Sequence, residues 1–465
     1  MNKKMISVLL AGTMALSMVA CGGGSDTAEN TTKDVATEET TETEQTVETS
    51  ADETEASDTT IETTGVTGAT IELEYGITGA QLEAFQEIVQ KFTDETGIGV
   101  VITQPGNVYE DAMKTRMASG DLPDVWVTHG WSVLRYSEYM MPLEDQEWFA
   151  KIDDSLLPSI TDEDGHIYIL PITEAVCGVI YNKDVLAEAG IDPTTIRTWD
   201  DFTEACQTIK DNLQDITPIE MSCNTSGVNN YMLECMFPTF LTNEDAPNNK
   251  KEELINGSFD FMVDGVDTFN YIADWAEKGF FNEDALTADL TTAQKAVGEG
   301  RAAFIIYSTE CIPAMLTYSP DANLGVMPSP AASESGMSYY GVGEGNASCF
   351  GIWKDTEYEE ECKQFLNFLA RPENADKIAT DVDGGIPCLS DTGITDAYIL
   401  NAFKESQEQF KDDLTYDNFF DRSYQPSGMW GVFDDSMDIL LDGDAKSNID
   451  AALQNMQTNY FDLHE

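Results

Sequence analysis

The segment 164–184 restricts the fold more than any other part of the chain, because it combines a turn, two short apolar runs and the start of a helix. Residues 167–170 and 176–181 are rich in β-branched side chains and have the length of strands. Pro171 lies between them and prevents a single helix from spanning both runs. We interpret the segment as a crossing of the chain from one domain to another.

Two helices are predicted directly after the second run. Asn182 is a favourable N-cap for a short helix that ends near Gly190. Thr198 and Asp201 have the spacing of a capping box and predict the start of the next helix. Local sequence therefore defines both the crossing and the elements that follow it.

The N-terminus has the pattern of a lipoprotein signal. Lys3 and Lys4 precede an apolar run, residues 5–15, and small residues lead to Cys21 and the glycines 22–24. An ordinary signal peptide would not explain the cysteine, and the run is shorter than the roughly 20 residues a membrane helix needs. We expect residues 1–20 to be removed and Cys21 to carry a lipid that anchors the protein at the extracellular face of the cell membrane.

Residues 21–70 are expected to form a disordered acidic tether. From Ser25 onwards the segment consists mostly of Thr, Glu, Asp, Ser and Ala, with Lys33 as its only basic residue and no aromatic side chain. Such a composition cannot bury a core, and its like charges repel one another. An acidic tail that binds a basic partner is the alternative interpretation.

The remaining chain is long enough for two lobes and is 42% apolar overall. A net charge of −61 with only 24 basic residues argues against nucleic-acid binding and against charge-driven adhesion to an anionic membrane. The charge favours solubility and says nothing of a substrate.

Eight cysteines follow Cys21, and their pairing is left open. No Cys-x-x-Cys pair occurs, and the chain has three histidines, so we expect no metal site. Most of the cysteines lie within apolar runs, which favours buried free thiols over disulfides. These residues are Cys177, Cys206, Cys223, Cys235, Cys311, Cys349, Cys362 and Cys388.

The first part of the body alternates between strand and helix patterns. Strands are expected at 69–75, 98–103 and 125–128, and helices at 82–96 and 108–119. This order predicts an α/β fold with a parallel or mixed sheet.

Order and spacing together resemble the extracellular solute-binding proteins of ABC importers, family 1, among them the maltodextrin-binding group. The similarity rests on the crossing segment and on residues 117–126, 300–307, 324–330 and 365–373. It implies a two-lobed, periplasmic-binding-protein-like fold of class II, with a ligand cleft between lobes joined by hinge crossings. The implied lobes are residues 71–176 with 346–392, and residues 177–345 with 393–465.

In such a fold the ligand residues lie on loops at strand ends. The implied set for one lobe is Tyr75, Thr78, Thr128, His129 and Trp131, with Glu174 at the crossing. Core packing for Trp131, a satisfied loop position for His129 and a solvent-facing position for Glu174 are the alternatives.

The second lobe contributes the remaining predicted contacts. They are Asn224, Asn229, Tyr231, Tyr307, Glu310, Gly343, Glu344 and Trp430. Amides both donate and accept, which suits sugar hydroxyls, and flat aromatic faces pack on sugar rings. A polar surface turn is the alternative for the asparagines, and flexibility alone for Gly343. Glu310 stands where maltodextrin binders often have an aromatic residue, which argues against a maltodextrin ligand.

The resemblance implies a receptor that captures a carbohydrate, in particular an oligosaccharide, and delivers it to membrane permease subunits. It implies a monomer with no cofactor and no enzymatic activity, since ATP hydrolysis belongs to a partner. A lipid-anchored glycoside hydrolase, a receptor for a non-sugar solute and a surface adhesin are the alternatives. No nucleophile elbow, phosphate loop or His-Glu-x-x-His motif supports an enzyme.

Overall fold

A computed structural model of the chain describes the body of the protein. Residues 56–465 form one compact unit by their contacts. The described residues are 59–77, 79–104, 109–129, 136–153, 156–162, 164–224, 229–243, 249–344, 348–394 and 397–464. The predicted signal peptide, the predicted lipidation site Cys21, and the predicted ligand residues Thr78 and Trp131 lie outside them.

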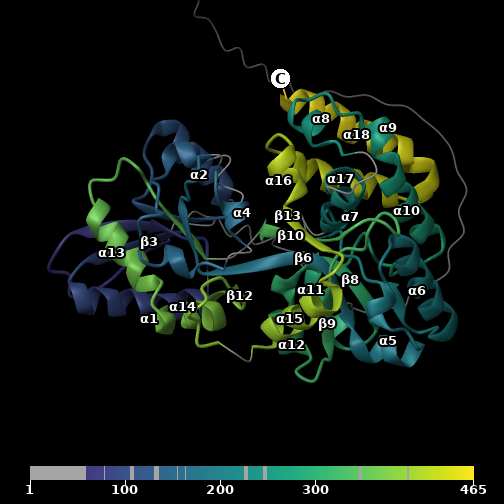
Figure 1. The fold of residues 1–465 in the computed structure, drawn as a ribbon, viewed down its shortest axis with the longest axis horizontal. Coiled ribbons are helices and arrows are strands. Elements are labelled where there is room, and N and C mark those ends of the chain that lie inside the picture. Colours follow the sequence, from purple (N-terminus) through teal and green to yellow (C-terminus); the bar gives the residue numbers. More distant parts are fainter. Residues whose placement is uncertain are drawn as a thin grey trace, which may run out of the picture. The chain divides into compact units, whose positions relative to one another are not determined.

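Two β-sheets organise this unit (Figure 1). The first has the strand order β1-β3-β2-β4-β11-β5. Its strands are β1 (Thr59–Glu62), β2 (Thr70–Glu74), β3 (Gly99–Gln104), β4 (Val125–Thr128), β5 (Ile169–Pro171) and β11 (Cys349–Ile352). Strands β2, β3 and β4 are parallel, whereas β1, β11 and β5 pair antiparallel with their neighbours, so the sheet is mixed as predicted.

Helices of the first sheet supply much of its core. They are α1 (Gly79–Thr96), α2 (Tyr109–Ser119), α4 (Leu157–Ile160), α13 (Glu359–Leu369) and α14 (Pro372–Lys377). In α1 the fully buried Phe85, Val89 and Phe92 recur at helical spacing and face the sheet. Phe85 stacks on Phe350 of β11 with ring centroids 5.9 Å apart, which joins a helix to a strand far away in sequence.

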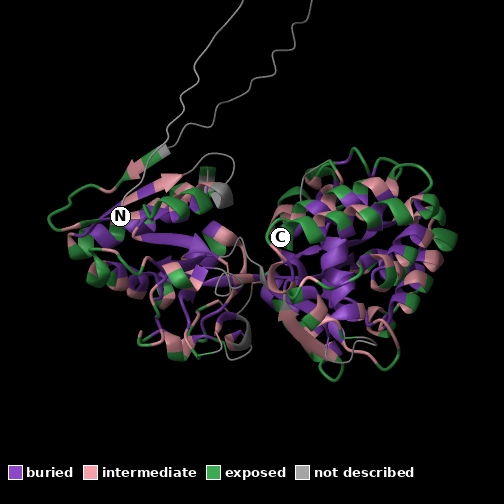
Figure 2. Ribbon diagram, turned by 90° about the horizontal axis from the view of Figure 1, so that it is seen from above, coloured by how far each residue is buried: buried purple, intermediate pink, exposed green. Residues whose placement is uncertain are grey.

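The second sheet has the order β13-β10-β6-β8-β7, with β9 and β12 also paired to β6. Its strands are β6 (Thr173–Asn182), β7 (Thr217–Ile219), β8 (Ala302–Ser308), β9 (Leu324–Met327), β10 (Ser338–Glu344), β12 (Ile386–Pro387) and β13 (Leu414–Asn418). Every residue of β8 is buried, and Figure 2 shows many of the exposed residues on the outer helices.

The second sheet is surrounded by many helices. They are α5 (Lys183–Ala189), α6 (Trp199–Asn212), α7 (Tyr231–Leu241), α8 (Lys251–Ile255), α9 (Phe261–Asp264), α10 (Val266–Glu277), α11 (Leu290–Gly298), α12 (Ile312–Tyr318), α15 (Tyr398–Phe410), α16 (Phe420–Tyr424), α17 (Met429–Leu441) and α18 (Ala445–His464). Buried apolar residues separate into two clusters, one around each sheet.

The segment 164–184 supplies one strand to each sheet. It contains β5, which pairs with β11, and β6, which pairs with β8 and β10. Asn182 Oδ1 accepts hydrogen bonds from the amides of Asp184 and Val185, both at 3.1 Å, and Gly190 ends the helix with a φ of 75°. The predicted caps are therefore confirmed.

The tether prediction is wrong at its C-terminal end. Residues 59–62 form β1 at the edge of the first sheet, and Thr63 Oγ1 accepts from the amide of Val100 at 3.0 Å. The amides of Thr67 and Gly68 donate to the carbonyl of Gly97. A strand this short acquires its stability from the neighbouring β3, so its own composition gives little sign of it.

All eight cysteines of the body lie in the described part of the chain, and no disulfide joins them. Seven are buried and Cys223 is partly buried, which agrees with the prediction of small apolar packing residues. Over the described residues, no helix has the length and apolar character that crossing a membrane requires.

Candidate functional site

Three aromatic side chains meet beside the second sheet, near the C-terminal end of β8. Tyr231 begins α7, Tyr307 lies near the end of β8, and Trp430 lies in the first turn of α17. The ring of Tyr231 is 4.2 Å from that of Tyr307 and 5.1 Å from that of Trp430, to which it is perpendicular. The two tyrosines are buried, whereas Trp430 is partly exposed. Trp430 therefore presents an apolar surface on a rigid aromatic support.

Arg422 of α16 extends this aromatic group with a positive charge. Its guanidinium carbon lies 4.6 Å from the ring centroid of Trp430, and its Nη1 donates to Asp421 Oδ2 at 2.8 Å. Asp421 is buried, with 2% of its surface exposed. The pairing holds the planar guanidinium beside the indole, where its N–H groups suit hydroxyl oxygens.

Glu234 fixes α16 relative to α7. Its carboxylate accepts hydrogen bonds from the amides of Phe420 at 2.8 Å and Asp421 at 3.2 Å. These are the first amides of α16, where a negative charge stabilises the exposed N–H groups of a helix. Because Glu234 is one turn after Tyr231, the same contact positions Arg422 against the aromatic group.

The predicted asparagines take different positions. Asn229 is buried, and its Nδ2 donates to Asp438 Oδ1 of α17 at 3.0 Å. Its neighbour Asn230 donates to the carbonyl of Trp430 at 3.1 Å. Asn224 is exposed. Asn229 and Asn230 thus hold the start of α7 against α17. A ligand contact for Asn224 and Asn229 stays a prediction.

A buried hydrogen-bond network lies where the chain passes between the sheets. Asp383 accepts from the Ser348 amide at 3.0 Å, from Ser348 Oγ at 3.1 Å and from the Tyr75 hydroxyl at 3.2 Å. Thr173 Oγ1 donates to Asp383 Oδ2, the oxygen that also accepts from the Ser348 amide. Burial raises the pKa of Asp383, and these hydrogen bonds oppose the shift. One carboxylate thereby joins the start of β6, the start of β11 and the approach to β12.

Glu174 lies beside this network on β6, opposite Ile386 of β12. Part of the residue is accessible to solvent, yet burial of its carboxyl, together with the charge of Asp153, raises its pKa to about 8. The group is protonated at neutral pH and can then donate as well as accept.

The other predicted residues are placed as follows. Tyr75 is buried and belongs to the network, Thr128 is buried at the end of β4, and His129 follows it partly exposed. Glu310 is half-buried in a short turn after β8, and Gly343 and Glu344 end β10. A direct role in ligand binding stays a prediction for each of them.

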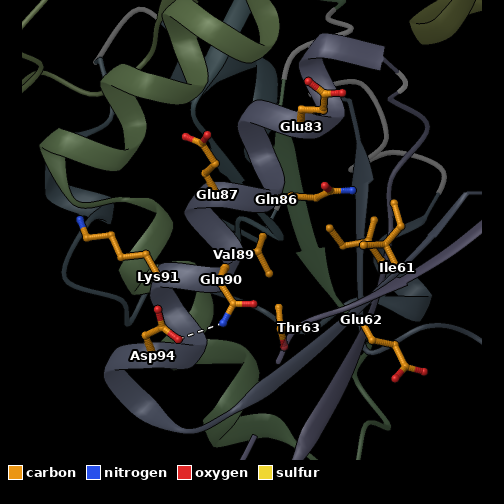
Figure 3. Close-up of a pocket in the computed structure, with 11 residues that line it drawn as sticks. Ile61, Glu62, Thr63, Glu83, Gln86, Glu87, Val89, Gln90, Lys91 and Asp94 are labelled. Atoms are coloured by element: carbon orange, nitrogen blue, oxygen red, sulfur yellow. Dashed lines mark hydrogen bonds between the residues drawn. The ribbon is translucent and has the colours of Figure 1, made fainter. Parts of the chain in front are cut away.

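A separate surface pocket of about 570 Å³ lies between β1 and α1 (Figure 3). Acidic and amide side chains line much of it, and Gln90 donates to Asp94 at 2.9 Å. The pocket shares no residue with the aromatic group around Trp430. Within the described ranges, no cluster of His, Cys, Asp or Glu is arranged to hold a metal ion.

Residues 78–376 match the model of the bacterial extracellular solute-binding proteins. The chain belongs to this family. It is 30% identical over 364 residues to the melibiose/raffinose/stachyose-binding protein of Bacillus subtilis, with 76% of this chain and 81% of that protein covered.

Solved structures of solute-binding proteins show the same fold. A putative binding protein of Bacillus subtilis in an open conformation has 27% identity and a TM-score of 0.77, with 86% of this chain and 98% of that chain covered. A sugar transporter protein of Bacillus licheniformis in complex with stachyose has 29% identity and a TM-score of 0.72, covering 85% of this chain and 100% of that chain. The predicted two-lobed α/β fold of class II and the predicted family are confirmed.

Three charged residues of the aromatic group and of the buried network were not predicted from the sequence. They are Arg422, Glu234 and Asp383, of which Arg422 and Glu234 each carry a sequence signal. Arg422 is one of 24 basic residues and lies in an aromatic stretch, while Glu234 interrupts an otherwise apolar helix. Glu220 lies directly after β7, and burial raises its pKa to about 7.

Proposed function

We propose that this solute-binding protein captures an oligosaccharide of the melibiose, raffinose and stachyose series and passes it to the permease of an ABC importer. The observation that carries the proposal is the partly exposed Trp430, supported by buried Tyr231 and flanked by Arg422. An apolar ring beside hydrogen-bond donors matches a sugar, whose ring has apolar C–H faces and hydroxyl edges. The similarity to a melibiose/raffinose/stachyose-binding protein supports this series of sugars.

Recognition by both lobes completes the proposal. We assign residues 71–176 with 346–392 to one lobe and 177–345 with 393–465 to the other. Ligand contacts to both lobes favour the closed form, because a ligand shifts a conformational equilibrium only through its different affinity for the two states. The Asp383 network ties together the segments that must bend during closure.

The protein acts as a monomer anchored through Cys21 at the extracellular face of the membrane. The lipoprotein signal pattern that ends at Cys21 supports the anchor, and the acidic sequence before β1 supports the tether. The permease is its protein partner, and the strong negative charge argues against nucleic acid.

The test uses the full-length lipoprotein in detergent and a panel of melibiose, raffinose, stachyose and maltotriose. Stachyose or raffinose is expected to raise the melting temperature, because a ligand that binds only the folded state stabilises it. Chromatography is expected to recover the sugar intact. Hydrolysis products would favour the glycoside hydrolase instead. An unchanged melting temperature with melibiose, raffinose and stachyose would refute the assigned sugar series.

Trp430→Ala is the matching variant. It is expected to abolish most of the stachyose-induced shift while the melting temperature without sugar stays close to that of the wild type. Trp353→Ala is a control, since this tryptophan is partly exposed and packs against the core of the first sheet, away from the Trp430 group. Equal sugar responses of the wild type and Trp430→Ala would remove Trp430 from the site.

A further inference from the structure

Two buried cysteines of the second sheet region have their sulfur atoms in contact. Cys177 lies on β6 and Cys235 on α7, and their Sγ atoms are 2.9 Å apart. Both residues are almost fully buried, with 1% and 0% of their surface exposed. Even carbon atoms without a bond between them meet only at about 3.5 Å, so this is a very close approach for two larger sulfur atoms.

We propose that Cys177 and Cys235 form a disulfide in the exported protein. A disulfide has an S–S length of about 2.05 Å, so bond formation requires the two sulfurs to approach by about 0.9 Å more. The proteins of this family are extracellular, and disulfides persist outside the cell. The proposal rests on that location and is independent of which sugar is bound.

The oxidant is the disulfide of an oxidoreductase or of oxidised glutathione, which reacts by thiol–disulfide exchange. One cysteine thiolate attacks a sulfur of that disulfide, which forms a mixed disulfide and releases one thiol. The second cysteine then attacks the mixed disulfide and releases the other thiol. Both cysteine protons are transferred to the two released thiolates, and two electrons reduce the oxidant.

The bond would connect the central strand of the second sheet to the helix that carries Tyr231. Cys177 pairs in register with Ser308 of β8 and Gly341 of β10, so it lies in the middle of the sheet. Cys235 is four residues after Tyr231 and therefore lies on the same face of α7. A covalent link at this position restrains the helix on which the aromatic group is built.

Full-length protein that is unfolded, reduced and then refolded with oxidised and reduced glutathione provides the test. Free thiols are alkylated after denaturation, and tryptic peptides are analysed without reduction. Cleavage at lysine places Cys177 in peptide 152–183 and Cys235 in peptide 211–250. The expected product is these two peptides joined, lighter by two hydrogen atoms than their sum. Alkylation of both cysteines in the refolded protein would overturn the proposal.

Cys223 provides the matched control because it lies in the same tryptic peptide as Cys235. Cys223→Ser should leave the joined peptides in place, whereas Cys235→Ser should remove them and also the rise in melting temperature of the oxidised over the reduced protein. Joined peptides that persist in Cys235→Ser and vanish in Cys223→Ser would overturn the assignment. In the wild type, an alkyl group located on Cys223 within the joined peptides assigns the bond to Cys235, so this mapping decides the question even where a variant does not fold, and it uses no sugar.

Discussion

Replacing Glu174 by Gln should remove the part of the pH dependence of folding stability that comes from this one buried carboxyl. In the folded protein, burial of the carboxyl and the nearby charge of Asp153 raise the pKa of Glu174 to about 8, against an ordinary value of 4.5. The folded state therefore keeps a proton that the unfolded chain releases at much lower pH. Gln has nearly the same shape and is neutral at every pH.

The sign follows from proton linkage. A raised pKa in the folded state means that Glu174 stabilises the fold fully only below its unfolded pKa, and that this contribution decreases as the pH rises to about 8. With these two pKa values the loss amounts to about 3 kcal/mol between about pH 5 and pH 8. Above the folded pKa the loss is complete, and stability no longer changes with this group.

Urea denaturation of the wild type and Glu174→Gln, measured at several pH values between about 5 and 8, tests the prediction. The free energy of unfolding of the wild type should fall relative to that of Glu174→Gln by about 3 kcal/mol over this range. Glu188→Gln, at an exposed position of α5, is the control and should follow the wild type. A constant difference between the wild type and Glu174→Gln across the range would refute the assignment of a buried, protonated carboxyl.

Three further substitutions test other contacts. Glu234→Ala removes the acceptor of the first amides of α16 and should lower the free energy of unfolding by about 2 kcal/mol in urea titrations, with the exposed Glu204→Ala nearly neutral. Ser348→Ala removes a hydroxyl donor to Asp383 and should cost about 1 kcal/mol by the same method; a smaller effect than that of a surface serine would contradict the network. Arg422→Lys keeps the charge but loses the planar guanidinium, so calorimetry should show stachyose binding weakened by about tenfold at an unchanged melting temperature, and wild-type affinity would exclude Arg422 from the site.

Features that depend on neighbouring residues could be predicted from the sequence. The helix caps at Asn182 and Thr198 are examples, because their partners lie two or three residues away. The strand runs on either side of Pro171 were predictable for the same reason, since β-branched residues and a proline act locally. These local signals, in the order in which they occur, also carried the resemblance that identified the fold.

Features that depend on distant residues could not be predicted from the sequence. Glu234 contacts amides 186 and 187 positions away, and Asp383 contacts Thr173 at a separation of 210. A single sequence does not show which distant positions contact each other. The contacts of Glu234 and Asp383 could therefore not be predicted. Strand β1 was missed because it gains its hydrogen bonds from β3, while its own Thr- and Glu-rich sequence looks like tether.

The predicted ligand residues fall between these cases. Trp430 and Tyr231 were selected separately, and the structure brings their rings within 5.1 Å of each other. Tyr75 was selected for a loop and instead has a buried ring and a hydroxyl bonded to Ser348 and Asp383. Residue type and position along a strand were the grounds for selecting these residues, whereas the direction of each side chain required the tertiary structure.

A structure of the full-length protein crystallised with stachyose would test the central claim most directly. The account predicts a sugar ring packed against Trp430, with hydroxyl groups hydrogen-bonded to Arg422. A bound sugar that leaves Trp430 and Arg422 without contact would contradict it.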